Sequence, residues 1–448
     1  MRIITSSELG RYSNQILNHI ITNPWKFKIM KSKKKFQFID LFCGIGGFHQ
    51  ALTQLGGECV FASDIDKECQ KTYFENYGLM PVGDITKVDE KTIPNFDVLC
   101  GGFPCQSFSK AGNRKGIEDA RGTLFFDILR IAKHHKPKFM LLENVRNLAG
   151  HDNGRTWKII HENLVEIGYS VSESPIIFSP HFIGIPQHRE RVFILCKRSD
   201  IGNVPEFNFQ PKPHLKCEVD YILQDDSEID LEKYKLNNEV ISLIEIWNDF
   251  IQGLKTPLPG FPVWADRLCE LDMDEDLEIL PKWKKTFIIK NNDLYENNKR
   301  FLDSWLKRAQ KLENFNGSKA MFEWQAGKVE DPNIWNTIMQ FRPSGLRVKS
   351  PTYFPALVAI TQTSILGNKR RFITPRECAR IQSFPDDFIL NPKDSIAYKQ
   401  FGNSVNVRVV KMFSEFLLQR EVFNPDTYHL TNKPTFNSKN QLSLELLT

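Results

Sequence analysis

The sequence predicts an α/β protein with a doubly wound, mostly parallel sheet, helices on both sheet faces, and a second, smaller domain. Residues 36–200 alternate short apolar strands with amphipathic helical stretches, which is typical of parallel strands joined by right-handed crossovers. Residues 218–349 differ from them in charge and tryptophan content. The length of 448 residues is sufficient for both domains.

The elements of the first domain follow from the spacing of its apolar side chains. Glycines at 44–47 separate the first predicted strand from a helix, and apolar residues at helical spacing recur from Leu124 onward. Expected strands cover residues 36–42, 59–62, 96–100, 139–142 and 192–196, and expected helices cover residues 48–55, 67–77 and 124–132.

The composition is ordinary for a soluble protein, with 41% hydrophobic and 25% charged residues. It excludes a disordered chain, a collagen-like repeat and a small disulfide scaffold. No apolar run approaches the length of a membrane-spanning helix, and the N-terminus does not resemble a signal peptide. The nine cysteines are scattered and never spaced as C-x-x-C, so neither a metal site nor a disulfide framework is indicated. We therefore expect a cytoplasmic protein that resides in a reducing compartment.

Charge is distributed unevenly along the chain, although the formal net charge is only +5. Residues 1–35 contain eight basic residues and one acidic residue. Residues 218–278 contain 17 acidic and 4 basic residues, whereas residues 282–349 contain 14 basic and 7 acidic ones. This basic stretch is either a phosphate-facing surface or a solvated helix face. Six of the eight tryptophans lie between residues 247 and 335, which supports a separate module there.

The first loop, Asp40-Leu-Phe-Cys-Gly-Ile-Gly-Gly-Phe48, indicates a cofactor site. Glycines between a strand and a helix let a ligand approach the backbone and the free N–H groups of the helix. The spacing differs from the dinucleotide Gly-x-Gly-x-x-Gly pattern, which argues against a nicotinamide cofactor. Asp64 lies at the end of the second strand, where a carboxylate can bind a ribose hydroxyl, and Asp84 suits an adenine amino group. The alternative is a simple tight turn, but the two spaced acids favour a nucleoside cofactor.

The second loop offers a candidate nucleophile. Cys100 is expected to be buried at the end of a strand, whereas Cys105 lies on the loop that follows. Backbone N–H groups and nearby arginines can stabilise a thiolate in such a loop. A lone loop cysteine is most often a bystander, but the glycine-rich strand end before it favours a functional role. Residues 107–122 are rich in glycine, serine and charge, a composition that suits a mobile lid.

At these residues the chain closely resembles the DNA cytosine-C5 methyltransferases of restriction–modification type, which use S-adenosyl-L-methionine. The resemblance covers residues 37–200 and resumes at 371–415. In this order and spacing the matching pieces are highly specific; they are Asp40–Phe48, Gly83-Asp84-Ile85, Gly102-Phe-Pro-Cys-Gln106, Glu143-Asn144-Val145, Gln187-His-Arg-Glu-Arg191 and Phe401-Gly-Asn-Ser-Val405.

The resemblance implies a catalytic set. Cys105 would add to C6 of a cytosine flipped out of the duplex, which makes C5 nucleophilic. Glu143 would supply the proton near N3, and burial would raise its pKa. Arg191 would contact the cytosine O2 region and Glu143, and Arg189 would assist near the cysteine. The two arginines alternate along an expected strand, so their side chains should point the same way. His188 replaces the commoner arginine or lysine, a change expected to be harmless.

The resemblance also implies a cofactor pocket, with Asp64 on the ribose, Ile65 on the adenine face and Asp84 on the adenine amino group. The implied cofactor-binding residues are Phe42, Gly44, Gly46, Asp64, Ile65, Asp84, Leu124, Asn403, Ser404 and Val405. The expected DNA-binding residues are Gln106, Ser107, Arg342, Arg347 and Lys349, the last three because arginines among small residues suit base edges and phosphates. No metal is expected.

The expected organisation has four parts. A basic extension of residues 1–35 precedes a catalytic domain at 36–200, which a C-terminal helix at 395–420 completes. Residues 201–394 would form a target-recognition domain, and residues 421–448 a tail. Thr374-Pro-Arg-Glu377 reads as a helix N-cap, with proline at the first helical position and an acid in the first turn.

We therefore expect a sequence-specific methyltransferase that acts on duplex DNA as a monomer and is paired with a restriction endonuclease. A tRNA cytosine-C5 methyltransferase would use the same chemistry, but the long tryptophan-rich insert favours duplex DNA. A non-catalytic DNA- or cofactor-binding protein is a third reading, which the presence of Cys105, Glu143 and Arg191 disfavours. A nicotinamide dehydrogenase fails on the glycine spacing.

Overall fold

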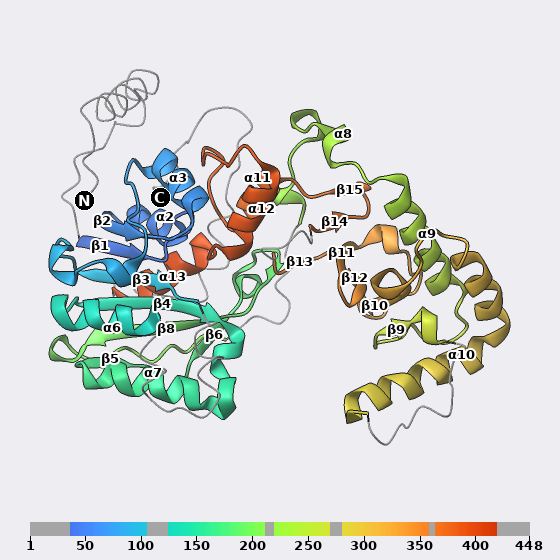
Figure 1. Ribbon diagram of the computed structural model, residues 1–448, viewed down its shortest axis with the longest axis horizontal. Coiled ribbons are helices and arrows are strands. Elements are labelled where there is room, and N and C mark those ends of the chain that lie inside the picture. Colours follow the sequence, from blue (N-terminus) through green and yellow to red (C-terminus); the bar gives the residue numbers. More distant parts are fainter. Residues whose placement is uncertain (1–35, 105–123, 211–218, 269–279, 358–362, 419–448) are drawn as a thin grey trace.

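The computed structural model describes residues 36–104, 124–210, 219–268, 280–357 and 363–418. The described chain forms two units that lie side by side (Figure 1). The first unit surrounds a seven-stranded sheet and the second surrounds a six-stranded one. None of the described helices is long and apolar enough to cross a membrane.

The sheet of the first unit has the strand order β2-β1-β3-β4-β8-β5, with β6 also paired to β8. Strands β1 to β4 are mutually parallel, as predicted. The strands are β1 (Phe36–Leu41), β2 (Gly57–Ser63), β3 (Val98–Gly102), β4 (Phe139–Val145), β5 (Tyr169–Val171), β6 (Ile176–Phe178) and β8 (Arg191–Arg198).

Strand β8 corrects the expectation that residues 192–196 form another parallel strand, because β8 runs antiparallel to β4, β5 and β6. A parallel connection needs a crossover of about a dozen residues or more, usually a helix. Between β6 and β8 the chain forms only the 3₁₀ turn Pro180–Ile183 and the two-residue strand β7 (Gln187–His188). The sheet is therefore mostly parallel, with one reversed strand.

Helices cover both faces of this sheet, so the doubly wound prediction is confirmed. One face packs against α2 and α13 through a cluster that includes Phe38, Phe48 and Phe413. The other face packs against α6 and α7 through a cluster that includes Ile128 and Ile160. The helices are α2 (Gly47–Gln54), α3 (Lys67–Tyr77), α6 (Leu124–His135), α7 (Arg155–Glu166) and α13 (Val407–Leu417).

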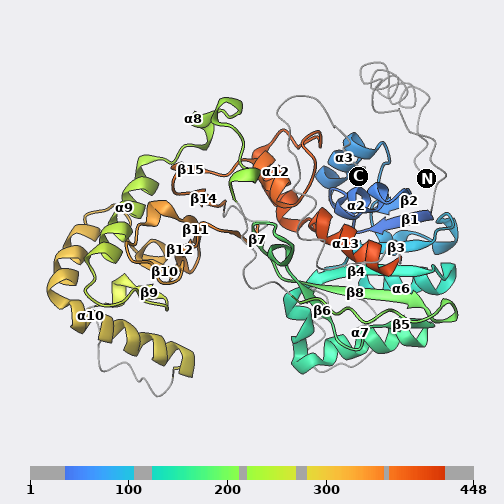
Figure 2. The ribbon, with the colours of Figure 1, turned by 180° about the vertical axis from the view of Figure 1, so that it is seen from behind.

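The second unit has its own sheet and its own core. The strand order is β15-β14-β11-β12-β10-β9. Helices α9 and α10 lie on the side of this sheet that faces away from the first unit (Figure 1, Figure 2). Trp247 and Trp305 from these helices are fully buried against Phe322 of the sheet. The elements are α8 (Leu231–Tyr234), α9 (Asn238–Gly253), α10 (Lys282–Ala309), β9 (Val263–Trp264), β10 (Met321–Gln325), β11 (Ile338–Arg342), β12 (Gly345–Lys349), β14 (Ile365–Leu366) and β15 (Arg371–Phe372).

The packing divides the chain differently from the boundary expected at residue 394. Phe384 and Phe388, like Cys378 on α11 (Pro375–Ile381), belong to the core of the first unit. Residues 373–394 therefore complete the first unit. The N-cap predicted at Thr374 is confirmed, and the structure shows a full capping box, since the Thr374 hydroxyl accepts from Glu377 N and the Glu377 carboxylate accepts from Thr374 N.

The single helix expected at 395–420 is two helices, α12 (Asp394–Asn403) and α13. The Asn406 side chain accepts hydrogen bonds from the backbone N–H groups of Arg408 and Val409, so it caps a new helix. A short sheet of β7 and β13 (Phe354–Pro355) lies between the two units (Figure 1, Figure 2).

Candidate active site and cofactor loop

The described residues predicted for catalysis and cofactor binding gather at the carboxyl edge of strands β1 to β4. Because parallel strands end at the same edge, the segments that follow them come together there. The segment after β1 begins at Phe42, the segment after β2 begins at Asp64, and Glu143 lies near the end of β4. Cys105, Gln106 and Ser107 follow β3 but lie outside the described residues, as does the predicted lid at 107–122.

The loop after β1 has the unusual backbone that its glycines predict. Phe42, Gly44 and Gly46 all have positive φ angles, of 55°, 53° and 85°. A Cβ atom on Gly46 would lie 2.3 Å from Cε2 of Tyr77, so a side chain does not fit there. The Asp64 carboxylate accepts hydrogen bonds of 2.8 Å from the backbone N–H groups of Gly44 and Asp66. The glycine loop and the predicted ribose-binding acid are therefore in direct contact.

The turn between α12 and α13 packs against the same loop. A Cβ atom on Gly47 would lie 2.6 Å from Cγ2 of Val405 and 3.1 Å from Oγ of Ser404. Asn403 is the last residue of α12, so these residues lie in a turn between two helices and not within the single helix expected at 395–420. The structure thus brings together loop residues that are more than 350 positions apart in the sequence.

The remaining predicted cofactor residues flank Asp64. Ile65 is 72% exposed, an apolar side chain left on the surface beside the acid. The backbone N–H of Asp64 donates to Val82 O at 3.0 Å, which brings the segment with Asp84 next to β2. The Asp84 carboxylate accepts from the backbone N–H and the hydroxyl of Thr86, and these bonds lower its pKa.

Leu124, the first residue of α6, is half-buried and packs against the core beneath the sheet. Burial raises the pKa of Asp64, and the backbone N–H groups of Asp66 and Gly44 oppose that rise. A strained glycine loop, a carboxylate held at its rim and an exposed apolar side chain suit a nucleoside cofactor. The residues present fit S-adenosyl-L-methionine.

Glu143 and Arg191 form a partly buried ion pair. Arg191 Nε lies 3.1 Å from Glu143 Oε1, and the two side chains are 20% and 12% exposed. Gly102 is paired with Glu143 across strands β3 and β4, and a Cβ atom on it would lie 3.1 Å from Glu143 Oε2. Burial raises the pKa of Glu143, while the charges of Arg191 and Arg189 oppose that rise. The carboxyl group therefore holds its proton to a higher pH than an exposed glutamic acid.

Arg189 does not lie on the same strand as Arg191, although the sequence predicted that it would. It lies between β7 and β8, so the alternation expected along one strand does not relate it to Arg191. Its guanidinium is buried and donates to the backbone carbonyls of Leu357, Gly402 and Ser404 at 2.9 to 3.0 Å. Burial, with Arg191 nearby, lowers the pKa of Arg189 to about 9, so the group stays charged at neutral pH. These bonds tie the turn after α12 to the segment after β13.

Asn144 is a residue to which the sequence reasoning assigned no role. Its side-chain Nδ2 donates to the carbonyl of Phe103 at 2.8 Å, and its Oδ1 accepts from the backbone N–H of Val145. It is almost fully buried. Phe103 lies two positions before Cys105, so Asn144 fixes the base of the cysteine loop. The sequence signal that could have identified Asn144 is its position directly after Glu143, in a segment that carries the family resemblance.

The predicted DNA-binding residues lie on the second sheet, with Arg342 on β11 and both Arg347 and Lys349 on β12. The lysines and arginines of residues 282–309 lie on α10 instead, on the side away from the first unit (Figure 1, Figure 2). Most of that basic stretch is therefore not on the face that carries these three residues.

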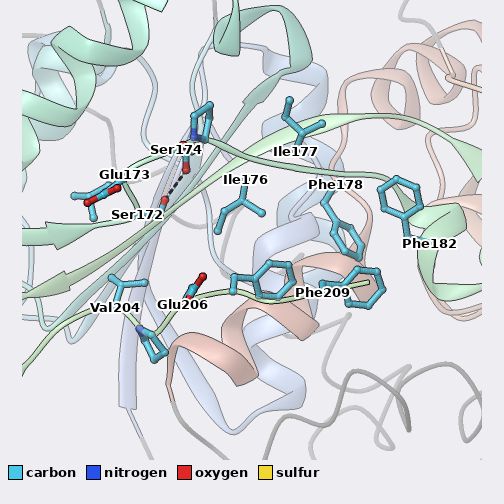
Figure 3. Close-up of a pocket in the computed structure, with 14 residues that line it drawn as sticks. Ser172, Glu173, Ser174, Ile176, Ile177, Phe178, Phe182, Val204, Glu206 and Phe209 are labelled. Carbon is cyan, nitrogen blue, oxygen red and sulfur yellow. Dashed lines mark hydrogen bonds between the residues drawn. The ribbon is translucent and has the colours of Figure 1, made fainter. Parts of the chain in front are cut away.

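A separate groove of about 610 Å³ lies beside β5 and β6 (Figure 3). Ser172 and Glu173 lie at one end of it, and Phe178, Phe182 and Phe209 lie at the other. None of the described residues predicted for catalysis, cofactor or DNA lines this groove. The candidate site is the carboxyl edge of the parallel strands, not this groove.

Comparison with known proteins agrees with this site. The family of C-5 cytosine-specific DNA methylases matches residues 36–418. The type II methyltransferase M.AluI of Cellulosimicrobium cellulans is 35% identical, over 85% of this chain and 91% of that protein. The type II methyltransferase M.HhaI of Haemophilus parahaemolyticus is 34% identical, over 84% and 92%. M.HpaII of Haemophilus parainfluenzae is 35% identical, over 87% and 90%.

The match spans both units and the segments that carry Asp64, Glu143 and Arg191. With the mostly parallel sheet and the glycine loop at its carboxyl edge, it identifies the chemistry of the chain. The chain belongs to the C-5 cytosine-specific DNA methylases, and it is a methyltransferase that uses S-adenosyl-L-methionine.

Proposed function

We propose that the enzyme methylates C5 of a cytosine flipped out of a specific duplex DNA sequence, through a covalent bond between Cys105 and C6. The observation that carries the proposal is the partly buried Glu143–Arg191 pair, which lies one strand from the loop that bears Cys105. A base inside the duplex is out of reach of such a site, so the target must leave the stack.

The chemistry explains why these groups are needed. C5 of cytosine is a weak nucleophile. The Cys105 thiolate adds to C6, and N3 takes a proton from Glu143, so C5 becomes an enamine carbon. After methylation the C5 proton passes to solvent water, and the Glu143 carboxylate takes back the N3 proton as the thiolate leaves, which restores the C5–C6 double bond. Arg191 holds the Glu143 carboxyl in place throughout, and Arg189 acts as a positioning residue.

The cofactor-binding roles are proposed for the residues at the rim of the glycine loop. Asp64 would accept from the ribose hydroxyls, Ile65 would cover the adenine face, and Asp84 would accept from the adenine amino group. Phe42, with Gly44 and Gly46, would line the methionine side, as would Leu124 and the turn at 403–405. When bound, S-adenosyl-L-methionine supplies the electrophilic methyl group.

Duplex DNA is the proposed substrate because the second unit adds a second sheet beside the catalytic one. The type II methyltransferase relatives support the further proposals that the enzyme acts in a bacterial cytoplasm and protects DNA from a paired endonuclease. We also propose that it acts as a monomer. We assign the target-reading role to Arg342, Arg347 and Lys349.

The test is methyl transfer from labelled S-adenosyl-L-methionine to unmethylated duplex DNA, followed by identification of the modified nucleoside. Labelled 5-methylcytosine from the wild type, absent with Cys105→Ala, is the expected result. Cys69→Ala is the matched control, since that thiol is buried and burial raises its pKa far above neutrality. Label in tRNA but not in duplex DNA would overturn the proposed substrate, and unchanged transfer by Cys105→Ala would overturn the nucleophile.

A further inference from the structure

The second sheet has one apolar and one polar face. Along β10 and β12, the side chains of Phe322 and Val348 point into the core beneath α9 and α10. Because side chains alternate across a strand, their neighbours Glu323, Arg347 and Lys349 point to the opposite side. We call the residues on that side the polar face; they are Glu323, Gln325, Gln340, Arg342, Arg347 and Lys349.

The polar face is turned toward the first unit. Helices α9 and α10 cover the other side of the sheet (Figure 1, Figure 2). Ile338, two residues before Gln340 and so on the same side of β11, packs into the core of the first unit. The polar face therefore borders the space between the units, on the same side as the proposed catalytic site.

The register sets the charged residues next to one another. Arg347 lies opposite Glu323 on one side and opposite Gln340 on the other. Arg347 Nε and Nη2 lie 2.9 and 2.7 Å from Glu323 Oε2, and the two side chains are only 24% and 17% exposed. The other oxygen of Glu323 accepts from Gln325. Both carboxylate oxygens of Glu323 are therefore engaged, Oε2 by Arg347 and Oε1 by Gln325.

Arg342 is fixed in the same way by a neutral partner. Its Nε and Nη2 lie 3.1 and 2.7 Å from Gln340 Oε1. Gln340 is itself buried and donates to Ser364 Oγ at 3.0 Å. Among the described residues, the Nη1 atoms of Arg342 and Arg347 have no hydrogen-bond partner. Each guanidinium thus binds its supporting side chain through Nε and Nη2. Its Nη1 N–H groups remain available to a ligand.

Such a fixed guanidinium suits one ligand in particular. Guanine presents two acceptors, O6 and N7, in the major groove, and the planar fork of arginine matches them. A phosphate contact does not require a buried support, since a flexible lysine or arginine makes it equally well. Lys349 beside them is half-buried, and burial together with Arg347 lowers its pKa.

We propose that the polar face reads base edges in the major groove, with Arg347 and Arg342 as guanine readers and Glu323 and Gln340 as the positioning residues that set their direction. This deepens the proposed function, because it rests on duplex DNA being the substrate. It adds Glu323 and Gln340 to the residues that determine the target sequence, although neither would touch the reacting base.

The experiment first takes the target sequence from plasmid DNA methylated by the wild type, read by cytosine-conversion sequencing. Binding of the wild type, Arg347→Lys and Glu323→Ala is then measured on the target duplex and on duplexes with one guanine replaced. Asp249→Ala is the matched control, because Asp249 supports Arg308 at 2.6 Å between α9 and α10, on the other side of the sheet.

We expect Arg347→Lys and Glu323→Ala to lose roughly 5- to 150-fold in discrimination at the same guanine, with an unchanged salt dependence. Asp249→Ala should keep the wild-type ratio. Equal losses on all duplexes, with the salt slope reduced by about one, would mean a phosphate contact and would overturn the proposal. Unchanged ratios in both variants would overturn it too. Absence of methylation by the wild type would instead refute the proposed function. Thermal unfolding checks that each variant is folded. Arg342→Lys, measured on the same duplexes, tests the arginine that Gln340 supports.

Discussion

Replacing Glu143 with glutamine removes the proposed proton donor and keeps its shape. Arg191 Nε lies 3.1 Å from the Glu143 carboxylate, and glutamine can still accept that hydrogen bond through its amide oxygen. The variant therefore separates proton transfer from the positioning of Arg191. General acid catalysis of this kind contributes about 10²- to 10⁴-fold in rate. We expect the single-turnover rate of methyl transfer to fall by that factor, while affinity for duplex DNA changes little.

The pH dependence of folding stability provides a second expected effect of Glu143→Gln. Burial raises the pKa of Glu143 in the folded state, so the folded protein binds this proton more tightly than the unfolded chain does. In the wild type, protonated Glu143 contributes in full to the free energy of unfolding below the unfolded pKa of about 4.3. This contribution is lost as the pH rises through the raised pKa of the folded state. Each unit of that shift corresponds to about 1.4 kcal/mol. Glu143→Gln lacks this loss, so it should be no less stable than the wild type at neutral pH.

The assay combines labelled methyl transfer with urea unfolding between pH 4.5 and 8. Glu162→Gln is the control, since Glu162 is an exposed carboxylate 3.8 Å from Lys158 Nζ, and it should transfer methyl groups at the wild-type rate. A Glu143→Gln rate within tenfold of the wild type would refute the proposed role. So would a loss of activity matched by an equal loss of DNA affinity or of folding stability.

Three other substitutions test the cofactor loop and its support. Asp64→Ala removes a carboxylate held by Gly44 N at 2.8 Å and should raise the Kd for S-adenosyl-L-methionine about 10- to 150-fold by calorimetry; an unchanged Kd would contradict the ribose role. Gly47→Ala puts a Cβ 2.6 Å from Val405 and should lower the free energy of unfolding by about 1–3 kcal/mol in urea, so an unaltered midpoint would count against this packing. Arg189→Lys keeps the charge but not the planar fork that holds three backbone carbonyls, and it should cost about 1–3 kcal/mol in thermal unfolding. Wild-type stability of that variant would show that these hydrogen bonds are dispensable.

Local sequence signals predicted the local structure well. The helix expected at 67–77 is α3, and Asp66 caps it through its side chain. The N-cap at Thr374 was readable because all its atoms lie within four residues. The glycines predicted the loop after β1 because glycine adopts positive φ angles without the steric cost that side chains impose.

What the sequence did not predict depends on distant pairing. The direction of β8 is set by its partners β4, β5 and β6, and no residue of β8 itself specifies it. The acceptors of Arg189 lie 168 to 215 positions away. Composition suggested Arg342 and Arg347, but the supporting roles of Glu323 and Gln340 require the register of β10, β11 and β12.

The core of the first unit is assembled from both ends of the described chain. Residues near Phe38 pack with residues near Phe413, and the entire second unit lies between them in the sequence. A ribosome makes about 5–20 residues per second, so roughly 10–40 s separate the synthesis of residue 200 from that of residue 417. During that interval the first sheet lacks α13 and the turn that contacts Gly47. A nascent or truncated chain that stops before α13 therefore cannot complete its cofactor loop, and methylating activity requires synthesis to pass residue 417.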